Sequence, residues 1–208
     1  MNTTRVEPPT GQWRINYRWR VVDIVVASVL GVAAGLVFFA WNQLYQQATG
    51  PLEVVLPGLQ ALLYGFWLFA GVLGALVVRK PGAAIFTEVV AAVVSALLGA
   101  QWGGFLTTEA GLVQGLGAEL VLLAFLYSNW RVYVAVLAGA GAGLAMAVND
   151  LILWYPGSAV AFATIYTISA VISGAVIAGL GSWFIVKALA KTGALNRFAS
   201  GREATVQA

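Results

Sequence analysis

Two carboxylates lie inside long apolar runs of this 208-residue chain. Glu88 stands within "RKPGAAIFTEVVAAVVSALLG", and Glu119 stands between "VQGLGA" and "LVLLAFL". If these runs cross a lipid bilayer, each carboxylate costs about 2.5 to 3.5 kcal/mol or more unless it is paired or hydrated. No Lys or Arg occurs at a matching depth in the runs. We expect at least one carboxylate to meet a cationic or amine-bearing ligand; the alternative is a structural hydrogen bond to a neighbouring helix.

Aromatic and amide side chains accompany these carboxylates. Tyr64 and Trp67 stand three residues apart, which places them on one face of a helix. A carboxylate beside aromatic rings suits a flat, positively charged heterocycle, through cation–π attraction and ring stacking. Gln114 adds an amide that can both donate and accept hydrogen bonds. Small residues follow the face of Glu88 and leave room for a ligand or for a helix: Ala84, Ala91, Ala92, Ser95 and Gly99.

Two further candidates stand at the ends of apolar runs. Asp150 closes one run, where capping or solvation of a helix end explains it about as well as ligand contact does. Trp102 lies in "GAQWGG", where an interfacial aromatic residue is the simplest interpretation and a lid over a ligand is the alternative. We count both residues as candidate ligand contacts.

The composition excludes several kinds of chemistry. The chain has no Cys and no His, which removes thiolate metal sites, disulfides and Ser–His catalysis. No G-x-x-x-x-G-K-[ST] motif occurs, so the chain is not expected to hydrolyse ATP by a P-loop. The net charge of +3 does not indicate a nucleic-acid partner, because the basic residues follow membrane topology. We expect transport or ligand capture, without an enzymatic centre, metal or cofactor.

The elements that position these residues are predicted to be membrane-spanning helices. Hydrophobic residues make up 61% of the chain and charged residues 9%, whereas average globular proteins have about 25% charged residues. Helices of about 20 residues satisfy their own backbone hydrogen bonds across a bilayer. We predict an all-α, polytopic six-helix bundle with spans at 21–44, 58–78, 83–100, 110–128, 132–150 and 160–188.

The positions of Lys and Arg predict the orientation. They precede the first span, separate spans two and three and spans four and five, and end span six: Arg14, Arg18, Arg20, Arg79, Lys80, Arg131, Lys187, Lys191, Arg197 and Arg202. The connections 45–57, 101–109 and 151–159 contain none. The positive-inside rule therefore places both termini in the cytoplasm. The predicted parts are a cytoplasmic lead (1–18), a six-helix substrate-binding domain (19–190) and a cytoplasmic tail (191–208).

Small residues recur every four positions in the first span. Ala27, Gly31 and Gly35 therefore share one helix face, and such rows let helices approach closely. Similar rows in spans five and six are interpreted as packing within the bundle. For the first span two interpretations stay open, namely packing within the bundle and docking of another membrane protein.

Five stretches of the chain, in order, resemble the YkoE-type substrate-binding S components of energy-coupling factor (ECF) vitamin importers. They are "WRVVDIV" (19–25), "YGFW" (64–67), "RKPGAA" (79–84), "VQGLGAE" (113–119) and "KTGALNRFASGRE" (191–203). The resemblance extends over nearly the whole chain. It implies a protein of the bacterial cell membrane that captures thiamine or its hydroxymethylpyrimidine precursor from outside.

The resemblance also implies partners and site residues. The partners are a transmembrane coupling protein and two cytoplasmic ATPases. S components are similar in using a small-residue row on span one to meet the coupling protein, and Ala27, Gly31 and Gly35 fit that pattern, with Gly where Ala is more usual. The ligand contacts it implies are Glu88, Tyr64, Trp67, Gln114 and Glu119.

Two other functions remain compatible with the sequence. One is a secondary transporter that uses Glu88 or Glu119 as a proton relay. The other is a membrane scaffold protein without a small ligand.

Overall fold

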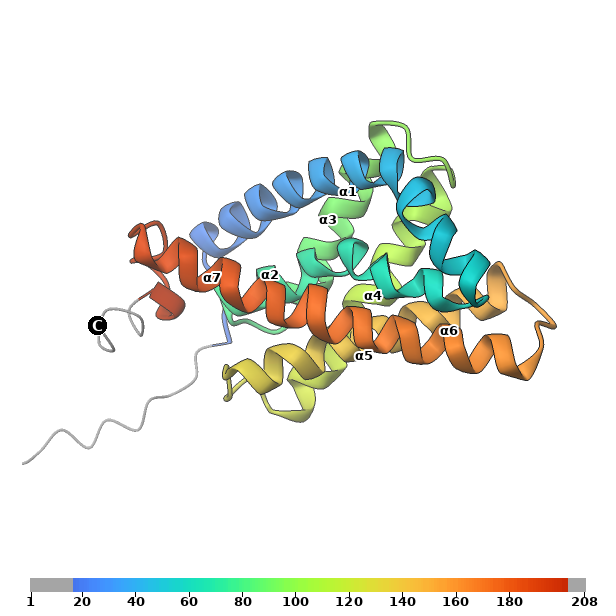
Figure 1. Ribbon diagram of the computed structural model, residues 1–208. Coiled ribbons are helices and arrows are strands. Elements are labelled where there is room, and N and C mark those ends of the chain that lie inside the picture. Colours follow the sequence, from blue (N-terminus) through green and yellow to red (C-terminus); the bar gives the residue numbers. More distant parts are fainter. Residues whose placement is uncertain (1–16, 202–208) are drawn as a thin grey trace, which may run out of the picture.

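The computed structural model describes residues 17–201, and all regular structure in that range is helical (Figure 1), which confirms the all-α prediction. The predicted lead and tail extend into 1–16 and 202–208, which lie outside the described residues. In chain order the elements are α1 (Val21–Val55), the 3₁₀ helix η1 (Leu59–Trp67), α2 (Phe69–Val78), α3 (Ala83–Leu97), α4 (Gly104–Ala124), α5 (Val132–Leu153), α6 (Val160–Ser173), the π-helical η2 (Gly174–Leu180) and α7 (Gly181–Lys191).

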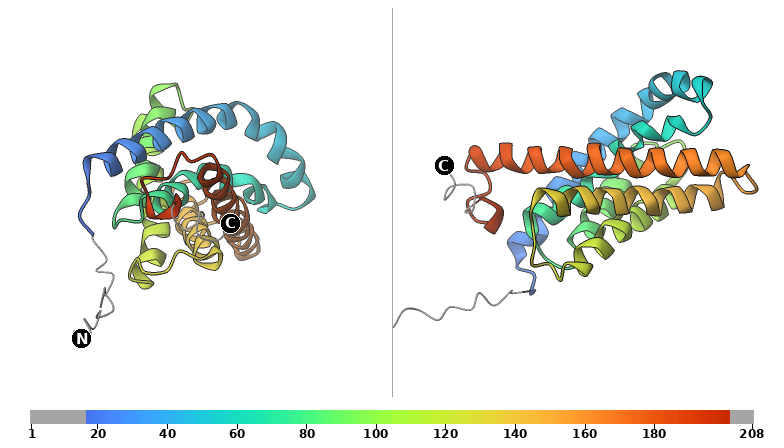
Figure 2. Two further views of the ribbon diagram at one scale, coloured as in Figure 1. Left: turned by 90° about the vertical axis from the view of Figure 1, so that its left-hand side faces the viewer. Right: turned by 60° about the horizontal axis from the view of Figure 1, so that its bottom comes forward.

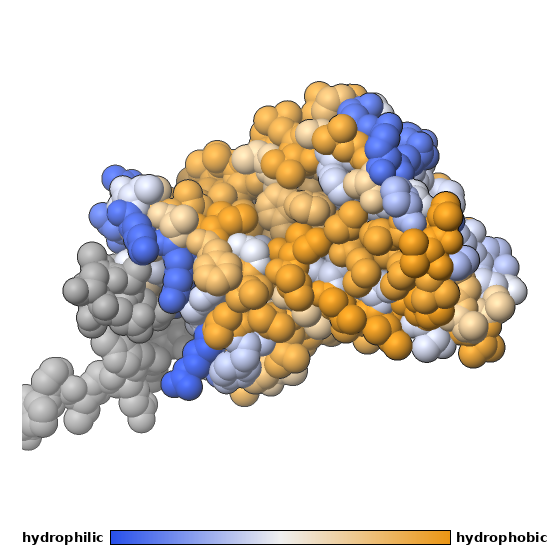
Figure 3. All heavy atoms as spheres, viewed as in Figure 1, coloured by the Kyte–Doolittle hydropathy of each residue, from blue (hydrophilic) through white to orange (hydrophobic). Residues whose placement is uncertain are grey.

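The lengths of these helices support four or five membrane spans within residues 17–201. α1, α4, α5 and the continuous rod of α6, η2 and α7 are each long and apolar enough to cross a membrane. η1 and α2 form a fifth candidate if they are counted as one span bent by 41°. α3 has 15 residues and rises about 22 Å, less than the roughly 30 Å of a hydrocarbon core. On the face that Figure 3 shows, apolar residues cover the middle, and hydrophilic residues lie towards its ends.

The small-residue face of α1 packs against α3. Ala27 is fully buried. A Cβ atom added to Gly31 would lie 2.7 Å from the Cβ of Val90, and one added to Gly35 would lie 2.7 Å from the Cβ of Val94. In this structure the row therefore packs against α3, as the first of the two open interpretations has it, and docking of another membrane protein stays a prediction. The exposed residues of α1 include larger apolar ones, among them Val25, Val29 and Leu36.

α5 lies alongside the rod of α6, η2 and α7 (Figures 1 and 2), and glycines bring the two backbones together. A Cβ atom on Gly139 would overlap the carbonyl oxygen of Gly174. On the rod, a Cβ atom on Gly179 would lie 2.6 Å from the carbonyl oxygen of Ala135. The predicted close packing of spans five and six is confirmed.

The segment before α1 ties together several chain segments at one end of the bundle. The Trp19 indole N–H donates to the carbonyl oxygen of Pro81 at 2.9 Å, and the Tyr17 hydroxyl donates to that of Leu126 at 3.2 Å. The guanidinium carbon of Arg20 lies 5.9 Å from the centre of the Phe198 ring. Segments that carry many of the basic residues therefore meet at one end, as the charge pattern requires.

Residues 192–201 fold back onto this end of the bundle. Leu195 and Phe198 are each only 4% exposed. The Ser200 hydroxyl donates to the carbonyl oxygen of Val77, near the end of α2, at 3.2 Å. The described part of the predicted tail is therefore packed against the helices.

Gly139→Ala should lower the thermal unfolding midpoint of the purified protein, because its methyl group would overlap the backbone of η2 and overpacking costs about 1 to 3 kcal/mol. Gly50→Ala is the matched control. A Cβ atom at Gly50 meets nothing within 4 Å, and Ala is the better helix former, so its midpoint should stay equal or rise. Equal midpoints for the two variants would contradict close packing at Gly139.

Candidate ligand-binding cavity

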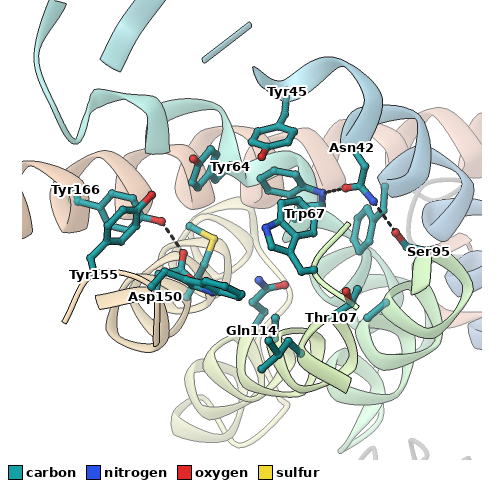
Figure 4. A pocket seen from close by; sticks show the side chains of 17 residues that line it. Asn42, Tyr45, Tyr64, Trp67, Ser95, Thr107, Gln114, Asp150, Tyr155 and Tyr166 are labelled. Atoms are coloured by element: carbon teal, nitrogen blue, oxygen red, sulfur yellow. Dashed lines mark hydrogen bonds between the residues drawn. The ribbon is translucent and has the colours of Figure 1, made fainter. Parts of the chain in front are cut away.

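A cavity of about 380 Å³ lies among α1, η1, α3, α4, α5 and α6 (Figure 4). Small-molecule sites occupy roughly 300 to 1,000 Å³, so the cavity can hold a compact ligand. Its aromatic lining residues are Phe38, Tyr45, Tyr64, Trp67, Trp102, Trp154, Tyr155 and Tyr166. Its polar lining residues are Asn42, Ser95, Thr107, Gln114 and Asp150, and the remainder are Ala92, Leu106, Ala110 and Met146.

Trp67 is at the centre of the aromatic wall. Its ring centroid lies 5.1 Å from that of Tyr64, 5.1 Å from that of Tyr45 and 5.2 Å from that of Trp102. All three pairs are edge-on, which is a favoured geometry for aromatic rings. The wall therefore joins η1, α1 and the segment between α3 and α4.

A short hydrogen-bond chain fixes Trp67 in this wall. Its indole N–H donates to Oδ1 of Asn42 at 2.7 Å, and Nδ2 of Asn42 donates to the hydroxyl oxygen of Ser95 at 3.0 Å. The hydroxyl oxygen of Ser95 is thus an acceptor, which leaves its hydrogen available to a ligand. Figure 4 shows this chain crossing from η1 to α1 and on to α3.

Asp150 gives the cavity its acidic character. Its Oδ2 accepts a hydrogen bond from the Tyr166 hydroxyl at 2.5 Å, and Tyr155 lies close by (Figure 4). Among the described residues that line the cavity, none is Lys or Arg. A carboxylate without a basic partner, next to aromatic faces, suits a cationic ligand.

The backbone of η1 is held by polar side chains. The run has nine residues, whereas 3₁₀ helices longer than three or four residues are uncommon. The Gly65 N–H donates to the Ser173 hydroxyl at 2.7 Å, and a Cβ atom on Gly65 would lie 2.5 Å from the Ser173 carbonyl oxygen. With three residues per turn, Tyr64 and Trp67 project from the same side of η1.

The cavity brings together five of the seven ligand contacts expected from the sequence: Tyr64, Trp67, Trp102, Gln114 and Asp150. The other two, Glu88 and Glu119, do not line it.

Glu88 is buried next to the cavity wall and hydrogen-bonds backbone. It is 1% exposed, and its Oε2 accepts the N–H of Gly71, the third residue of α2, at 2.5 Å. Its Oε1 has no hydrogen-bond partner within the described structure. Leu68 precedes α2 and has no side-chain acceptor, so Glu88 caps this helix from α3. One helical turn farther along α3, Ala92 lines the cavity.

Glu119 has the same kind of role one helix later. Its two carboxylate oxygens accept the N–H of Gly82 at 2.6 Å and the N–H of Ala84 at 3.0 Å, at the start of α3. In this structure, both carboxylates therefore make the structural hydrogen bonds that were the alternative to ligand contact.

Several lining residues were not among the sequence-based candidates. Asn42 and Tyr45 stand three residues apart at the end of the predicted first span, and this polar pair after an apolar run was the available signal. Tyr155 stands in the predicted connection 151–159, where an interfacial aromatic residue is the simplest interpretation and a lid over a ligand is the alternative. Tyr166 lies within the apolar sixth span, and nothing in the local pattern pairs it with Asp150.

Comparisons with known proteins agree on a transport family. A family model described as the permease component of an ABC-type cobalt transport system matches residues 22–145. The chain is 35% identical over 186 residues to a Bacillus subtilis (strain 168) protein named HMP/thiamine permease protein YkoE, covering 89% of the chain and 92% of the relative. It matches a crystal structure of an S component of an ECF transporter with a TM-score of 0.82 and 34% identity, covering 91% of this chain and 95% of the other.

Glu119→Ala should lower the thermal unfolding midpoint, because two backbone N–H groups at the start of α3 lose their acceptor. An unsatisfied buried donor costs about 1 to 3 kcal/mol. Glu53→Ala, at an exposed position after Pro51 in α1, should shift the unfolding free energy by less than about 0.5 kcal/mol. A midpoint for Glu119→Ala equal to that of Glu53→Ala would argue against the capping role.

Proposed function

Because this chain belongs to the YkoE-type S components of ECF transporters, multi-pass proteins of the bacterial membrane, we propose that it captures thiamine or its hydroxymethylpyrimidine precursor for import. The relative's name refers to HMP and thiamine. The single observation that best supports the proposal is the cavity itself, in which Asp150 and a continuous aromatic wall stand together without a basic lining residue.

The chemistry of the cavity matches the two parts of thiamine. Thiamine joins a thiazolium cation to an aminopyrimidine ring. A carboxylate and aromatic faces attract such a cation, which assigns the thiazolium to Asp150. The aminopyrimidine needs donors and acceptors, and Gln114 and the Ser95 hydroxyl offer them from α4 and α3. Trp67 and Trp102 provide the surfaces on which flat rings can pack.

The carboxylates outside the cavity are assigned a different role. Glu88 and Glu119 each bind backbone N–H groups of a neighbouring helix, so we do not place either one against the ligand. The role of Glu88 is developed in the next subsection.

Transport requires partners that supply energy. The chain has no P-loop motif, so we propose that a transmembrane coupling protein and two cytoplasmic ATPases complete the importer. The small-residue row at Ala27, Gly31 and Gly35 is covered by α3 in this conformation. Docking through α1 would therefore use its exposed face, which otherwise contacts lipid.

We also propose six membrane passages with both termini in the cytoplasm. The four or five spans supported by length leave α3 as the remaining segment, and an even number of passages returns the chain to its starting side. The contacts of Trp19 with Pro81 and of Tyr17 with Leu126 place those connections at the same end as the start of α1. The cavity, on this arrangement, is nearer the outer side.

Asp150→Asn should weaken thiamine binding by roughly ten-fold to a hundred-fold, because charged hydrogen bonds and contacts contribute about 1.5 to 3 kcal/mol. Binding of the uncharged hydroxymethylpyrimidine should stay within about three-fold of the parent protein. Asn keeps an oxygen that can accept the Tyr166 hydroxyl, so the fold should be preserved. Isothermal titration of the purified protein with each compound measures both affinities.

Glu109→Gln is the matched control for charge near this site. Glu109 accepts a hydrogen bond from Asn149, the neighbour of Asp150, but does not line the cavity. Its thiamine affinity should stay within about three-fold of the parent. A parent protein that binds neither compound would refute the proposed function, and equal losses of both compounds in Asp150→Asn would refute the assignment of the thiazolium.

Single cysteines can test the topology, because the chain has none of its own. Glu53→Cys, at an exposed position between Pro51 and η1, should react with a membrane-impermeant maleimide on intact cells. Ser128→Cys, at an exposed position between α4 and α5, should react only after the membrane is permeabilised. Reaction of both positions from outside would contradict the six-passage arrangement.

A further inference from the structure

At the bend between η1 and α2, a backbone donor takes its acceptor from a side chain of another helix. The first N–H groups of a helix have no acceptor within that helix, and water is scarce inside a membrane protein. α2 begins after Leu68, whose side chain has no oxygen, and Leu68 itself is only 1% exposed. The N–H of Gly71, in the first turn, donates to Oε2 of Glu88 at 2.5 Å.

The surroundings of Glu88 leave little freedom for this contact to shift. A Cβ atom on Gly71 would lie 3.0 Å from Oε2 of Glu88 and 3.0 Å from the carbonyl oxygen of Ala84. On the other side, a Cβ atom on Gly115 would lie 3.2 Å from the Cβ of Glu88. Glycine at both positions lets α2 and α4 pack closely against the Glu88 side chain, α2 at its carboxyl group and α4 at its Cβ, which fixes the start of α2 relative to α3.

The same bend sets the position of the aromatic wall. Trp67 is the last residue of η1 and stands four residues before Gly71. Its indole N–H bonds to Asn42 on α1, and its ring meets Tyr64 and Trp102. A change in the bend would move this ring relative to Asn42 and to the segment that carries Trp102.

We propose that Glu88 is a positioning residue for the cavity: by accepting the Gly71 N–H it fixes the bend between η1 and α2 and thereby places Trp67 and Tyr64 in the cavity wall. The expected effect on thiamine affinity rests on the proposed function, whereas the expected effect on amide hydrogen exchange does not. On this proposal, residue 88 must provide an oxygen that accepts the Gly71 N–H. Oε1 of Glu88 receives no hydrogen bond from the described residues, so an amide nitrogen in its place breaks none of the described bonds.

Two substitutions separate this role from a requirement for charge. Glu88→Gln keeps an oxygen that can accept the Gly71 N–H, and Glu88→Met keeps a similar unbranched shape without a comparable acceptor. Thr87→Val is the control for a neighbouring buried change, because the Thr87 hydroxyl donates to the Ala83 carbonyl oxygen within α3. Each variant is assayed for thiamine affinity and for hydrogen exchange of the amides in 68–72.

In the Gln variant, thiamine affinity should stay within about three-fold of the parent and the Gly71 amide should stay protected. In the Met variant, the Gly71 amide should exchange about ten-fold faster or more, because it loses the buried hydrogen bond that protects it in the parent. Its thiamine affinity should fall by roughly five-fold to ten-fold, because aromatic contacts contribute about that factor and the wall that makes them would be displaced. Thr87→Val should match the parent in both measurements.

Loss of affinity in the Gln variant equal to that in the Met variant would overturn the proposal, because charge would then be the requirement. So would a Met variant with parental exchange and parental affinity. If the Met variant does not fold, exchange at Gly71 in the Gln variant decides: protection supports the capping role and deprotection overturns it. If the parent binds no thiamine, the proposed function fails, and the exchange data still test the role of Glu88.

Discussion

Backbone polar groups inside a membrane protein need acceptors and donors from the protein itself, and this constraint governs the interior of the present fold. Among the helices that begin at residues with no side-chain cap are α2, after Leu68, and α3, after Gly82. Each takes its acceptor from the following helix: Glu88 on α3 caps α2, and Glu119 on α4 caps α3. The two carboxylates therefore connect three consecutive helices in series.

The cavity depends on that series because its wall is built on the bent segment. η1 presents Tyr64 and Trp67 on one side, and Ser173 on α6 and Asn42 on α1 hold it from elsewhere in the bundle. Polar lining groups that already bond to one another do not have to be ordered when a ligand arrives. A site prepared in this way loses less conformational entropy on binding than one that must assemble around its ligand.

The sequence predicts local features of this protein better than its tertiary contacts. Composition and apolar runs are sufficient for the helical membrane class, and the three-residue spacing of Tyr64 and Trp67 places them on a shared face. The function of Glu88 depends instead on the Gly71 N–H, 17 residues earlier, and no local spacing encodes an acceptor supplied by another helix. Likewise, the spacing of Gly31 and Gly35 suits a partner or α3 equally, and their contacts with Val90 and Val94 of α3 are visible only in the structure.

The hydrogen bond from Ser200 to the Val77 carbonyl joins residues 123 positions apart in the chain. Translation proceeds at about 5 to 20 residues per second, so the ribosome adds the intervening chain in roughly 6 to 25 s. During that interval α2 has been synthesised but its final contact does not yet exist. Because residues 192–201 leave the ribosome after all the described helices, the end of the bundle near Val77 can close only after those helices have been made. Membrane insertion of the helices and completion of the fold are thus separated in time.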